Sequence, residues 1–545
     1  MSDFNREAHQ YPNFATALNA WGRERIGRLA VRIHGTEITY EELDATTARI
    51  AAGFRNLGLA KGDRITYLSA YTKETLLTIL ASYRAGAISV VLNEYLKGDA
   101  LRHQLSDSDP KVLVVDDDGL AMLLSLGPEL NLPELSTVVV IGADCDADTE
   151  KCTFETVAWN SLTLAEPLRE LDIAGPHDPA QIVYTSGTTG LPKGCVLSQR
   201  YLLHQGEVFS EWTGLRADDT YMSSAPLYHV SGLHVLTTGF VSGATVAVEP
   251  RFSASQFWTR VEAVGATAFH GLGFTTLALL AQPERDSDKE HSLRIFWSGA
   301  APHEAKEKFE KRFAVPVIGG GYGQTEVNPV SMVSADFPPG DRNSMGRPFG
   351  YLEVRLVDAS DNDVAEGEVG EIVLRPLRAG VMFNGYWRQP EATLKTWRNL
   401  WHRTGDLARF DETKNLQFAG RTNDSMRRRG ENVSAYQVEQ AIAKYPAVRE
   451  VAVFGVRIDT EVDDCIKADI VVDDSDTFDI GKFAAFVNRE LPYYATPRFV
   501  EFVDVLPRNA SGRVTKHVLN RDVSGPLVTD LHESGLAVSR SDRRR

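Results

Sequence analysis

The chain reads Tyr184-Thr185-Ser186-Gly187-Thr188-Thr189-Gly190-Leu191-Pro192-Lys193-Gly194 directly after the short apolar run Ile182-Val183. This stretch combines glycines, hydroxyl side chains and one lysine. Glycine lets a backbone approach a ligand closely, hydroxyl and amide groups donate hydrogen bonds to phosphate oxygens, and lysine adds a positive charge. The stretch therefore predicts a loop that holds a triphosphate.

This loop differs from the phosphate-binding loop of kinases and GTPases. That loop ends in Gly-Lys-Ser or Gly-Lys-Thr, whereas here Pro192 precedes Lys193 and Gly194 follows it. A simple nucleotide hydrolase is therefore disfavoured. Taken alone, the stretch is also compatible with a surface loop rich in glycine and threonine, so its meaning depends on the rest of the chain.

Further motifs follow the loop in a fixed order. They are Tyr322-Gly323-Gln324-Thr325-Glu326, then Thr404-Gly405-Asp406, then Gly420-Arg421 with Arg429-Gly430-Glu431-Asn432. Together with the loop they resemble the adenylate-forming superfamily, which includes acyl-CoA synthetases, adenylation domains of peptide synthetases and firefly luciferase. The resemblance covers about residues 15 to 520. The chain is most similar to carnitine/crotonobetaine-type and medium-chain acyl-CoA ligases, through residues 429–434 and Leu506-Pro507-Arg508-Asn509.

Length and composition favour a soluble multi-domain enzyme. The 545 residues exceed what one core supports, and 43% of them are apolar. A net charge of −16 argues against a nucleic-acid or anionic-membrane partner, since both bind basic surfaces. The polar start lacks a signal-peptide core, and no apolar run is long enough to span a membrane, so we expect a cytoplasmic protein. The cysteines form no metal or disulfide pattern: Cys145, Cys152, Cys195 and Cys465.

Alternating strand-like and helix-like segments in residues 30 to 120 predict layered, doubly wound α/β sheets. Thr39 and Glu42 form a capping box ahead of a helix that we expect to end at Gly58. The remaining predicted elements are strands at 65–68, 88–92, 112–115, 137–141 and 294–296, a helix at 76–83, and a helix capped by Ser198. A β-rich subdomain is implied near residues 345–371 by the resemblance.

The chain is predicted to form two domains and a tail. A large N-terminal adenylation domain, residues 15–421, binds ATP and the acid. Beyond Arg421 the pattern restarts with a helix capped by Ser434 and strands at 451–456 and 466–472. This smaller α+β domain, residues 424–520, is mobile in the resembled family. Residues 521–545 are predicted to form a disordered tail.

The resemblance implies an ATP site assembled from distant segments. The phosphates are held by Thr185, Ser186, Gly187, Thr188, Thr189, Gly190 and Lys193, adenine is bordered by Gly299, Ala300, Ala301, Gly321 and Tyr322, and the ribose is bound by Asp406 and Arg421. Glu326 is predicted to hold Mg²⁺, which prefers carboxylate, phosphate and water oxygens. Thr325 is predicted to contact the α-phosphate.

An acid pocket is expected beside the nucleotide. The family's aromatic and histidine segment corresponds to residues 226–232, so His229 is a candidate catalytic residue, although a histidine next to Tyr228 is more often simply packed. The remaining pocket candidates are Phe269, His270, Trp297, Val327 and Asn328. Such an aromatic and polar lining favours a small or aromatic acid over a long fatty chain.

The chain departs from the family pattern at three positions. The hinge residue, usually Asp or Lys, is Asn423. Arg429 replaces the first of two glycines in the loop past which the pantetheine arm of CoA reaches the adenylate; it either obstructs that passage, which we favour, or meets CoA phosphates. Arg513 stands where the family has its adenylation lysine, and its planar fork differs from a compact ammonium. Lys516 is the alternative candidate.

These assignments predict an ATP-dependent, AMP-forming ligase. An acid oxyanion attacks the α-phosphorus of Mg·ATP, pyrophosphate leaves, and a mixed anhydride with AMP remains. CoA is the expected acceptor. Two alternatives stay open. One is an adenylate former of secondary metabolism that transfers to an amine, including one that activates nitrite and converts an aryl amine into a diazo group. The other is a non-catalytic nucleotide-binding relative.

Overall fold

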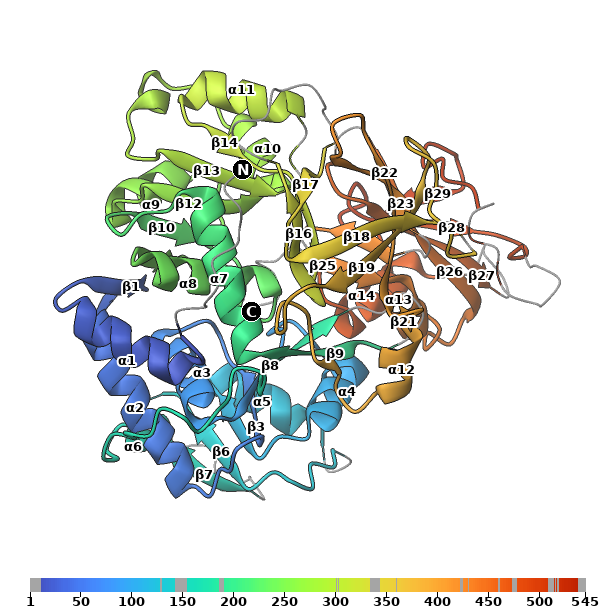
Figure 1. Ribbon diagram of the computed structural model, residues 1–545. Coiled ribbons are helices and arrows are strands. Elements are labelled where there is room, and N and C mark those ends of the chain that lie inside the picture. Colours follow the sequence, from blue (N-terminus) through green and yellow to red (C-terminus); the bar gives the residue numbers. More distant parts are fainter. Residues whose placement is uncertain are drawn as a thin grey trace. The chain divides into compact units, whose positions relative to one another are not determined.

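The computed structural model divides into two units, each described by itself (Figure 1). The first comprises Met1–Glu94, Leu105–Tyr184 and Gly194–Gly420, and the second comprises Tyr95–Gln104, Thr185–Lys193 and Arg421–Arg545. The structure describes residues 11–127, 130–142, 154–185, 191–299, 301, 303–333, 344–358, 360–421, 425–429, 431–458, 461–472, 478–507, 514, 516 and 519–537.

One sheet of the first unit has the strand order β20-β9-β8-β4-β3-β5-β6-β7. From β8 to β7 the neighbouring strands run parallel, and every residue of β4, β5 and β6 is buried. Such strands are typical of a sheet covered on both faces. The bounds are β3 Arg64–Leu68, β4 Ile88–Val91, β5 Val112–Val115, β6 Thr137–Val140, β7 Glu155–Ala158, β8 Pro179–Thr185, β9 Lys193–Ser198 and β20 Gly385–Tyr386.

A second sheet has the order β14-β13-β12-β10-β11-β1-β2 and is parallel except for the edge strand β2. The carboxyl ends of β10, β12 and β13 therefore share one edge, the place where α/β sheets bind ligands. The bounds are β1 Leu29–Ile33, β2 Thr36–Thr39, β10 Thr220–Ser223, β11 Thr245–Val248, β12 Ala268–Leu272, β13 Ile295–Gly299 and β14 Val317–Ile318.

Helices α3 and α7 are buried on nearly every side, as expected for helices in the interior. Figure 1 shows α7 between the strands of the two sheets. Ser198 caps α7, as predicted, by accepting a hydrogen bond from the Tyr201 amide at 3.1 Å, and the capping box of Thr39 and Glu42 is present on α2. The helices are α1 Phe14–Glu24, α2 Tyr40–Asn56, α3 Lys73–Ala85, α4 Gly98–Ser108, α5 Asp117–Ser125, α6 Trp159–Leu162, α7 Gln199–Thr213, α8 Val230–Ser242, α9 Phe257–Val264, α10 Gly273–Leu280, the 3-10 helix η2 Asp286–Lys289, α11 His303–Phe313 and α12 Pro390–Lys395.

The C-terminal part of the first unit is rich in antiparallel strands, as the resemblance implied. β15, β16 and β17 form one small sheet, and β18, β19, β22 and β21 form another, in which β23 also pairs with β22. The bounds are β15 Gly321–Gln324, β16 Val327–Met332, β17 Arg347–Pro348, β18 Leu352–Val357, β19 Gly370–Pro376, β21 Trp397–Arg398, β22 Trp401–Phe410 and β23 Leu416–Arg421.

The second unit is α+β. A sheet of order β26-β27-β28-β29 is joined by the ribbon β24-β25. Its hydrophobic core includes Val438 and Ile442 of α13 and Phe483 and Val487 of α14. The bounds are β24 Ser425–Arg428, β25 Glu431–Ser434, α13 Ala435–Ile442, β26 Val448–Val456, β27 Cys465–Val472, α14 Ile480–Glu490, β28 Phe499–Phe502 and β29 Val528–Asp530.

The predicted disordered tail, residues 521–545, begins too early. Val528, Thr529 and Asp530 pair with β28, and Leu531 is buried. The apolar side chains near residue 530 pack against the sheet, and this packing gives the segment a fixed conformation. The smaller unit therefore extends past residue 520, to at least residue 537; residues 538–545 lie outside the described part of the chain.

Taken over the described residues, none of the helices is long and apolar enough to cross a membrane.

Candidate active site

The glycine-rich loop joins two neighbouring strands. Thr185 ends β8 and Lys193 begins β9, and the Thr185 hydroxyl donates to the Lys193 carbonyl oxygen at 3.4 Å. This contact closes the base of the loop. The remaining predicted phosphate contacts, Ser186, Gly187, Thr188, Thr189 and Gly190, lie outside the described residues.

Thr325 and Glu326 form the tight turn between β15 and β16, since Gln324 pairs with Val327. The turn is held from two sides. Its Thr325 carbonyl oxygen accepts a hydrogen bond from the buried Tyr201 hydroxyl at 2.9 Å, and the Glu326 carbonyl oxygen accepts one from the Phe383 amide at 2.8 Å. The backbone that carries the predicted metal ligand is therefore fixed.

The Glu326 carboxylate is buried, and its Oε1 accepts a hydrogen bond from the Tyr386 hydroxyl at 2.6 Å. Burial and the neighbouring Glu326 carboxylate raise the pKa of Tyr386, so the phenol keeps its proton and donates. Tyr386 pairs with Cys195 on β9, and the Trp387 amide donates to the Gly194 carbonyl oxygen at 2.7 Å. Glu326 is thus linked to the strand that leads directly out of the glycine-rich loop.

Asp406 lies on β22 with its carboxylate oriented by two donors. The Tyr322 hydroxyl and the Gln324 side-chain amide both donate to Oδ2, each at 2.7 Å. The same amide of Gln324 donates to the Thr404 carbonyl oxygen at 2.8 Å. Asp406 is 3% exposed. The structure therefore brings together the predicted ribose ligand Asp406, the predicted adenine neighbour Tyr322 and the strand that leads to Glu326.

Gly299 ends β13, at the edge where the resemblance placed adenine. A Cβ atom on Gly299 would lie 2.9 Å from the Trp297 ring, and one on Gly319 would lie 2.0 Å from the Ser298 carbonyl oxygen. Side chains at these positions would therefore clash with the strand itself. Gly321 is exposed and Ala301 is buried, while Ala300 lies outside the described residues.

The acid-pocket candidates separate into two groups. His270 and Trp297 are partners on β12 and β13, and their rings stack with centroids 4.2 Å apart. Phe269 does not join them. It is 1% exposed and packs with Phe257 and Phe296 in the core, because adjacent residues of a strand point to opposite faces.

The other pocket candidates lie near the ends of elements. Tyr228 and His229 precede α8, with their rings 5.0 Å apart. Val327 is fully buried in the main core, whereas Asn328 is partly exposed next to Gly323. Sequence reasoning missed Phe209 and His234, whose rings stack 4.1 Å apart against the same group. The apolar helix 230–242 interrupted by one histidine was the available signal.

In the smaller unit, Lys516 forms an ion pair with Glu439 at 2.7 Å. Arg429 adopts a left-handed backbone conformation with φ 52°, and its guanidinium lies 5.5 Å from the centre of the Tyr493 ring. Arg421 ends β23, and nothing is described of its side chain. The hinge candidate Asn423 and the candidate catalytic Arg513 lie outside the described residues.

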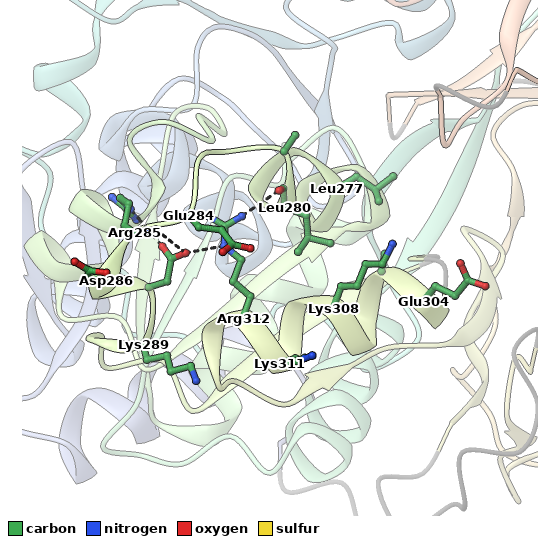
Figure 2. A pocket seen from close by; sticks show the side chains of 13 residues that line it. Leu277, Leu280, Glu284, Arg285, Asp286, Lys289, Glu304, Lys308, Lys311 and Arg312 are labelled. Carbon is green, nitrogen blue, oxygen red and sulfur yellow. Dashed lines mark hydrogen bonds and ion pairs between the residues drawn. The ribbon is translucent and has the colours of Figure 1, made fainter.

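A separate pocket of about 990 Å³ lies between α10, η2 and α11 (Figure 2). Three of its charged groups are engaged with one another: Asp288 binds Arg285 and Arg312 at 3.3 and 2.6 Å. Burial alone would raise the pKa of Asp288, but hydrogen bonds from Arg312 and the Arg285 backbone lower it. Arg312 also donates to the carbonyl oxygens of Leu280, Gln282 and Pro283. We attribute a structural role to this cluster.

The described residues contain no group of three or more His, Cys, Asp or Glu side chains that could hold a metal. A magnesium ion bound with ATP does not need such a group, because one carboxylate, phosphate oxygens and waters complete its octahedron. The buried, hydrogen-bonded carboxylate of Glu326, linked to the strand after the glycine-rich loop, fits that requirement.

Comparisons with known proteins identify the family of this chain. Residues 18–387 match the family model "AMP-binding enzyme", and residues 437–513 match "AMP-binding enzyme C-terminal domain". A crotonobetaine/carnitine--CoA ligase of Salmonella typhimurium is 31% identical over 490 residues, which cover 88% of this chain and 92% of that protein.

Two solved structures are similar over nearly the whole chain. ATP-bound MatB from Rhodopseudomonas palustris is 27% identical with a TM-score of 0.64, covering 93% of this chain and 98% of that one. A benzoate CoA ligase from Burkholderia xenovorans LB400 is 25% identical with a TM-score of 0.68, covering 94% and 100%. The chain therefore belongs to the AMP-binding enzyme family and is an ATP-dependent, AMP-forming ligase.

Proposed function

We propose that this ligase activates a small aromatic carboxylic acid as its AMP anhydride, releases pyrophosphate, and transfers the acyl group to CoA. The observation that carries the proposal is the fixed position of Glu326, hydrogen-bonded to Tyr386 and linked through β20 and β9 to the end of the glycine-rich loop. A carboxylate in that position suits an ion that accompanies the phosphates of ATP.

The chemistry needs positioning and charge neutralisation more than covalent help. Lys193 and the loop before it hold the phosphates that leave. Asp406, oriented by Tyr322 and Gln324, accepts the ribose hydroxyls. Thr325 contacts the α-phosphate while the acid oxyanion attacks it in line. When bound at Glu326, Mg²⁺ supplies positive charge that neutralises phosphate oxygens.

Arg513 is our candidate for the cation that bridges the acid and the α-phosphate. Lys516, the alternative, is paired with Glu439, whose carboxylate also accepts a hydrogen bond from the Val453 amide at 2.8 Å. Recruiting Lys516 would break that ion pair. Arg421 is assigned to the ribose or a phosphate, and Asn423 to the hinge, on the resemblance.

CoA as the acceptor is supported by the names of the relatives, which include a crotonobetaine/carnitine--CoA ligase and a benzoate CoA ligase. The second of these also supports an aromatic acid. The stacked rings of His270 and Trp297 also support an aromatic acid, because flat polar rings suit a flat substrate better than a long chain.

A second candidate is an adenylate former that transfers to an amine, with nitrite as one acid it would activate. Arg429 favours it. At a position where the family has glycine, this residue places a long cation over Tyr493, and an enzyme that never admits a pantetheine arm would tolerate it. A non-catalytic nucleotide-binding relative is the third outcome that the test below distinguishes.

The test is pyrophosphate release from Mg·ATP across a panel of aromatic acids and nitrite, with CoA or an aryl amine added in turn. Formation of an acyl-CoA with an aromatic acid is expected. AMP formation with an amine and indifference to CoA would favour the second candidate, and Arg429→Gly should then restore some use of CoA. ATP binding without pyrophosphate release under any acid would reject both.

A further inference from the structure

Four aromatic rings from four elements of the first unit form one continuous group. His270 on β12 stacks on Trp297 on β13, with centroids 4.2 Å apart and planes 9° apart. His234 on α8 meets His270 edge-on at 4.7 Å. Phe209 on α7 stacks on the other side of His234, at 4.1 Å and 11°.

The two imidazoles in this group are uncharged. His234 and His270 are each 2% exposed. Burial lowers the pKa of His234 to about 3 and lowers that of His270 well below its usual value. The group therefore offers hydrogen-bonding nitrogens without a charge at physiological pH.

Three ring nitrogens in this group are buried and lack a hydrogen-bond partner among the described residues: His234 Nδ1, His270 Nε2 and Trp297 Nε1. Buried polar atoms are nearly always paired in native proteins, and leaving them unpaired destabilises the empty state. Unpaired buried nitrogens also occur elsewhere in the described residues, His291 Nδ1 among them, but these three share one ring group near the carboxyl edge of β12 and β13, where a bound ligand would supply partners.

The hydrogen bonds of Ser223 favour one tautomer of His270. The Ser223 hydroxyl donates to the His270 carbonyl oxygen at 3.2 Å and accepts from the Ala225 amide at 3.1 Å. While the hydroxyl donates to that carbonyl oxygen, its oxygen can only accept from His270 Nδ1, which lies 3.4 Å away. The proton of the neutral ring is then on Nδ1, so Nε2 is an acceptor. The Trp297 indole nitrogen is always a donor.

The ring group lies at the predicted acid side of the site. Trp297 is two residues before Gly299, at the carboxyl edge of β13. Helix α7 connects the ring group to the turn of Thr325 and Glu326. The Tyr201 hydroxyl donates to the Thr325 carbonyl oxygen, and Phe209, eight residues later and about 12 Å along the helix, stacks on His234.

Resting on the proposed function, we propose that the substrate is an aromatic acid whose ring carries an uncharged hydroxyl or amino group. His270 Nε2 accepts a hydrogen bond from that group, and Trp297 Nε1 donates one to it. A hydroxyl or amine both donates and accepts, so it satisfies both nitrogens, which an unsubstituted ring does not. The rings stack on one another, and no anionic side chain belongs to the group, so a quaternary ammonium acid such as carnitine is a poor match.

The experiment compares kcat/KM for pyrophosphate release with benzoate, the hydroxybenzoates, the aminobenzoates and carnitine. At least one hydroxy- or aminobenzoate should exceed benzoate by about tenfold, the contribution of one well-placed hydrogen bond. In His270→Phe the ratio of kcat/KM for that acid to kcat/KM for benzoate should fall to near unity, and the ligand-free variant should have a higher Tm because a buried unpaired nitrogen is gone.

His291→Phe is the matched control. His291 also stacks on a tryptophan, Trp258, with centroids 4.6 Å apart, and its Nδ1 is likewise without a partner among the described residues, but it lies away from the site. This variant should keep the wild-type preference. Ser223→Ala, which frees the tautomer of His270 without touching the ring, is a second variant in case His270→Phe fails to fold; it should reduce the preference.

Equal rates with benzoate and every substituted benzoate, or a preference that survives in both His270→Phe and Ser223→Ala, would overturn the assignment and leave the proposed function intact. If no acid releases pyrophosphate, the proposed function fails. Calorimetric binding of the hydroxybenzoates to wild-type protein and to His270→Phe then decides the assignment by itself: tighter binding to the wild type supports it, and equal or absent binding rejects it.

Discussion

Replacing Glu326 with glutamine separates the metal role of this residue from its structural role. The amide keeps the shape of the side chain, and its oxygen can still accept the hydrogen bond that Tyr386 makes at 2.6 Å. A hydrogen bond to a charged acceptor contributes about 1.5–3 kcal/mol and a neutral one about 0.5–1.5, so the fold should lose only about 1–1.5 kcal/mol. For a unit of this size that is a fall of a few degrees in Tm.

The loss of activity in Glu326→Gln should be much larger than its loss of stability. Glu326 is the proposed charged ligand of Mg²⁺, and an amide oxygen binds a hard divalent cation without charge. Loss of one preorganised electrostatic contact at a reacting group typically lowers kcat by about 10²–10³. We expect a loss of that size in pyrophosphate release, with a higher Mg²⁺ concentration needed for half-maximal rate.

Tyr386→Phe is the matched control. It removes the hydrogen bond and leaves the carboxylate, so it should destabilise the protein by about 1.5–3 kcal/mol and keep most of the activity. The measurements are pyrophosphate release over a Mg²⁺ titration and thermal unfolding of all three proteins. A Glu326→Gln enzyme that stays within threefold of wild type at every Mg²⁺ concentration, or a Tyr386→Phe enzyme equally inactive, would refute the assignment.

Asp406→Asn should raise KM for ATP about tenfold in initial-rate assays and leave KM for the acid unchanged, because the ribose hydroxyls lose a charged acceptor. Arg513→Ala should lower pyrophosphate release at least about tenfold, whereas Lys516→Ala, whose ammonium is occupied by an ion pair, should mainly lower Tm; the opposite result would assign the bridging charge to Lys516. Asp288→Asn should lower Tm at pH 7. The Asp288 pKa is lowered by Arg312 in the folded protein, so its stabilisation is present above about pH 4 and is lost at lower pH; the difference in Tm from wild type should therefore shrink at about pH 3.

Signals confined to neighbouring residues predicted the fold well. The capping box of Thr39 and Glu42 and the cap at Ser198 are present, and the strands at 65–68 and 112–115 fall within a residue of β3 and β5. These features depend on hydrogen bonds between residues three apart or on short apolar runs, which the sequence displays directly.

The contacts that complete the site were not predictable in this way. Tyr386 is 60 residues from Glu326, and Gln324 is 82 residues from Asp406. Nothing local marks Tyr386 as a donor to Glu326, because that contact depends on β20 joining the edge of β9. The placement of Phe269, in contrast, could have been predicted from the sequence. Side chains alternate between the two faces of a strand, so Phe269 and His270 of β12 face opposite ways and do not belong in one pocket.

Arg429 shows how the chain tolerates a residue that its backbone conformation disfavours. The left-handed conformation at φ 52° costs a residue with a side chain about 1–2 kcal/mol. The contact of the guanidinium with the Tyr493 ring stabilises the wild type by about 0.5–1 kcal/mol. A glycine at this position would lose more chain entropy on folding, which would destabilise the variant by about 0.5–1 kcal/mol. These contributions nearly cancel, so Arg429→Gly should change stability by less than about 1 kcal/mol. Any change in acceptor use by that variant then reports the removal of the side chain from the loop, because the stability of the fold stays the same.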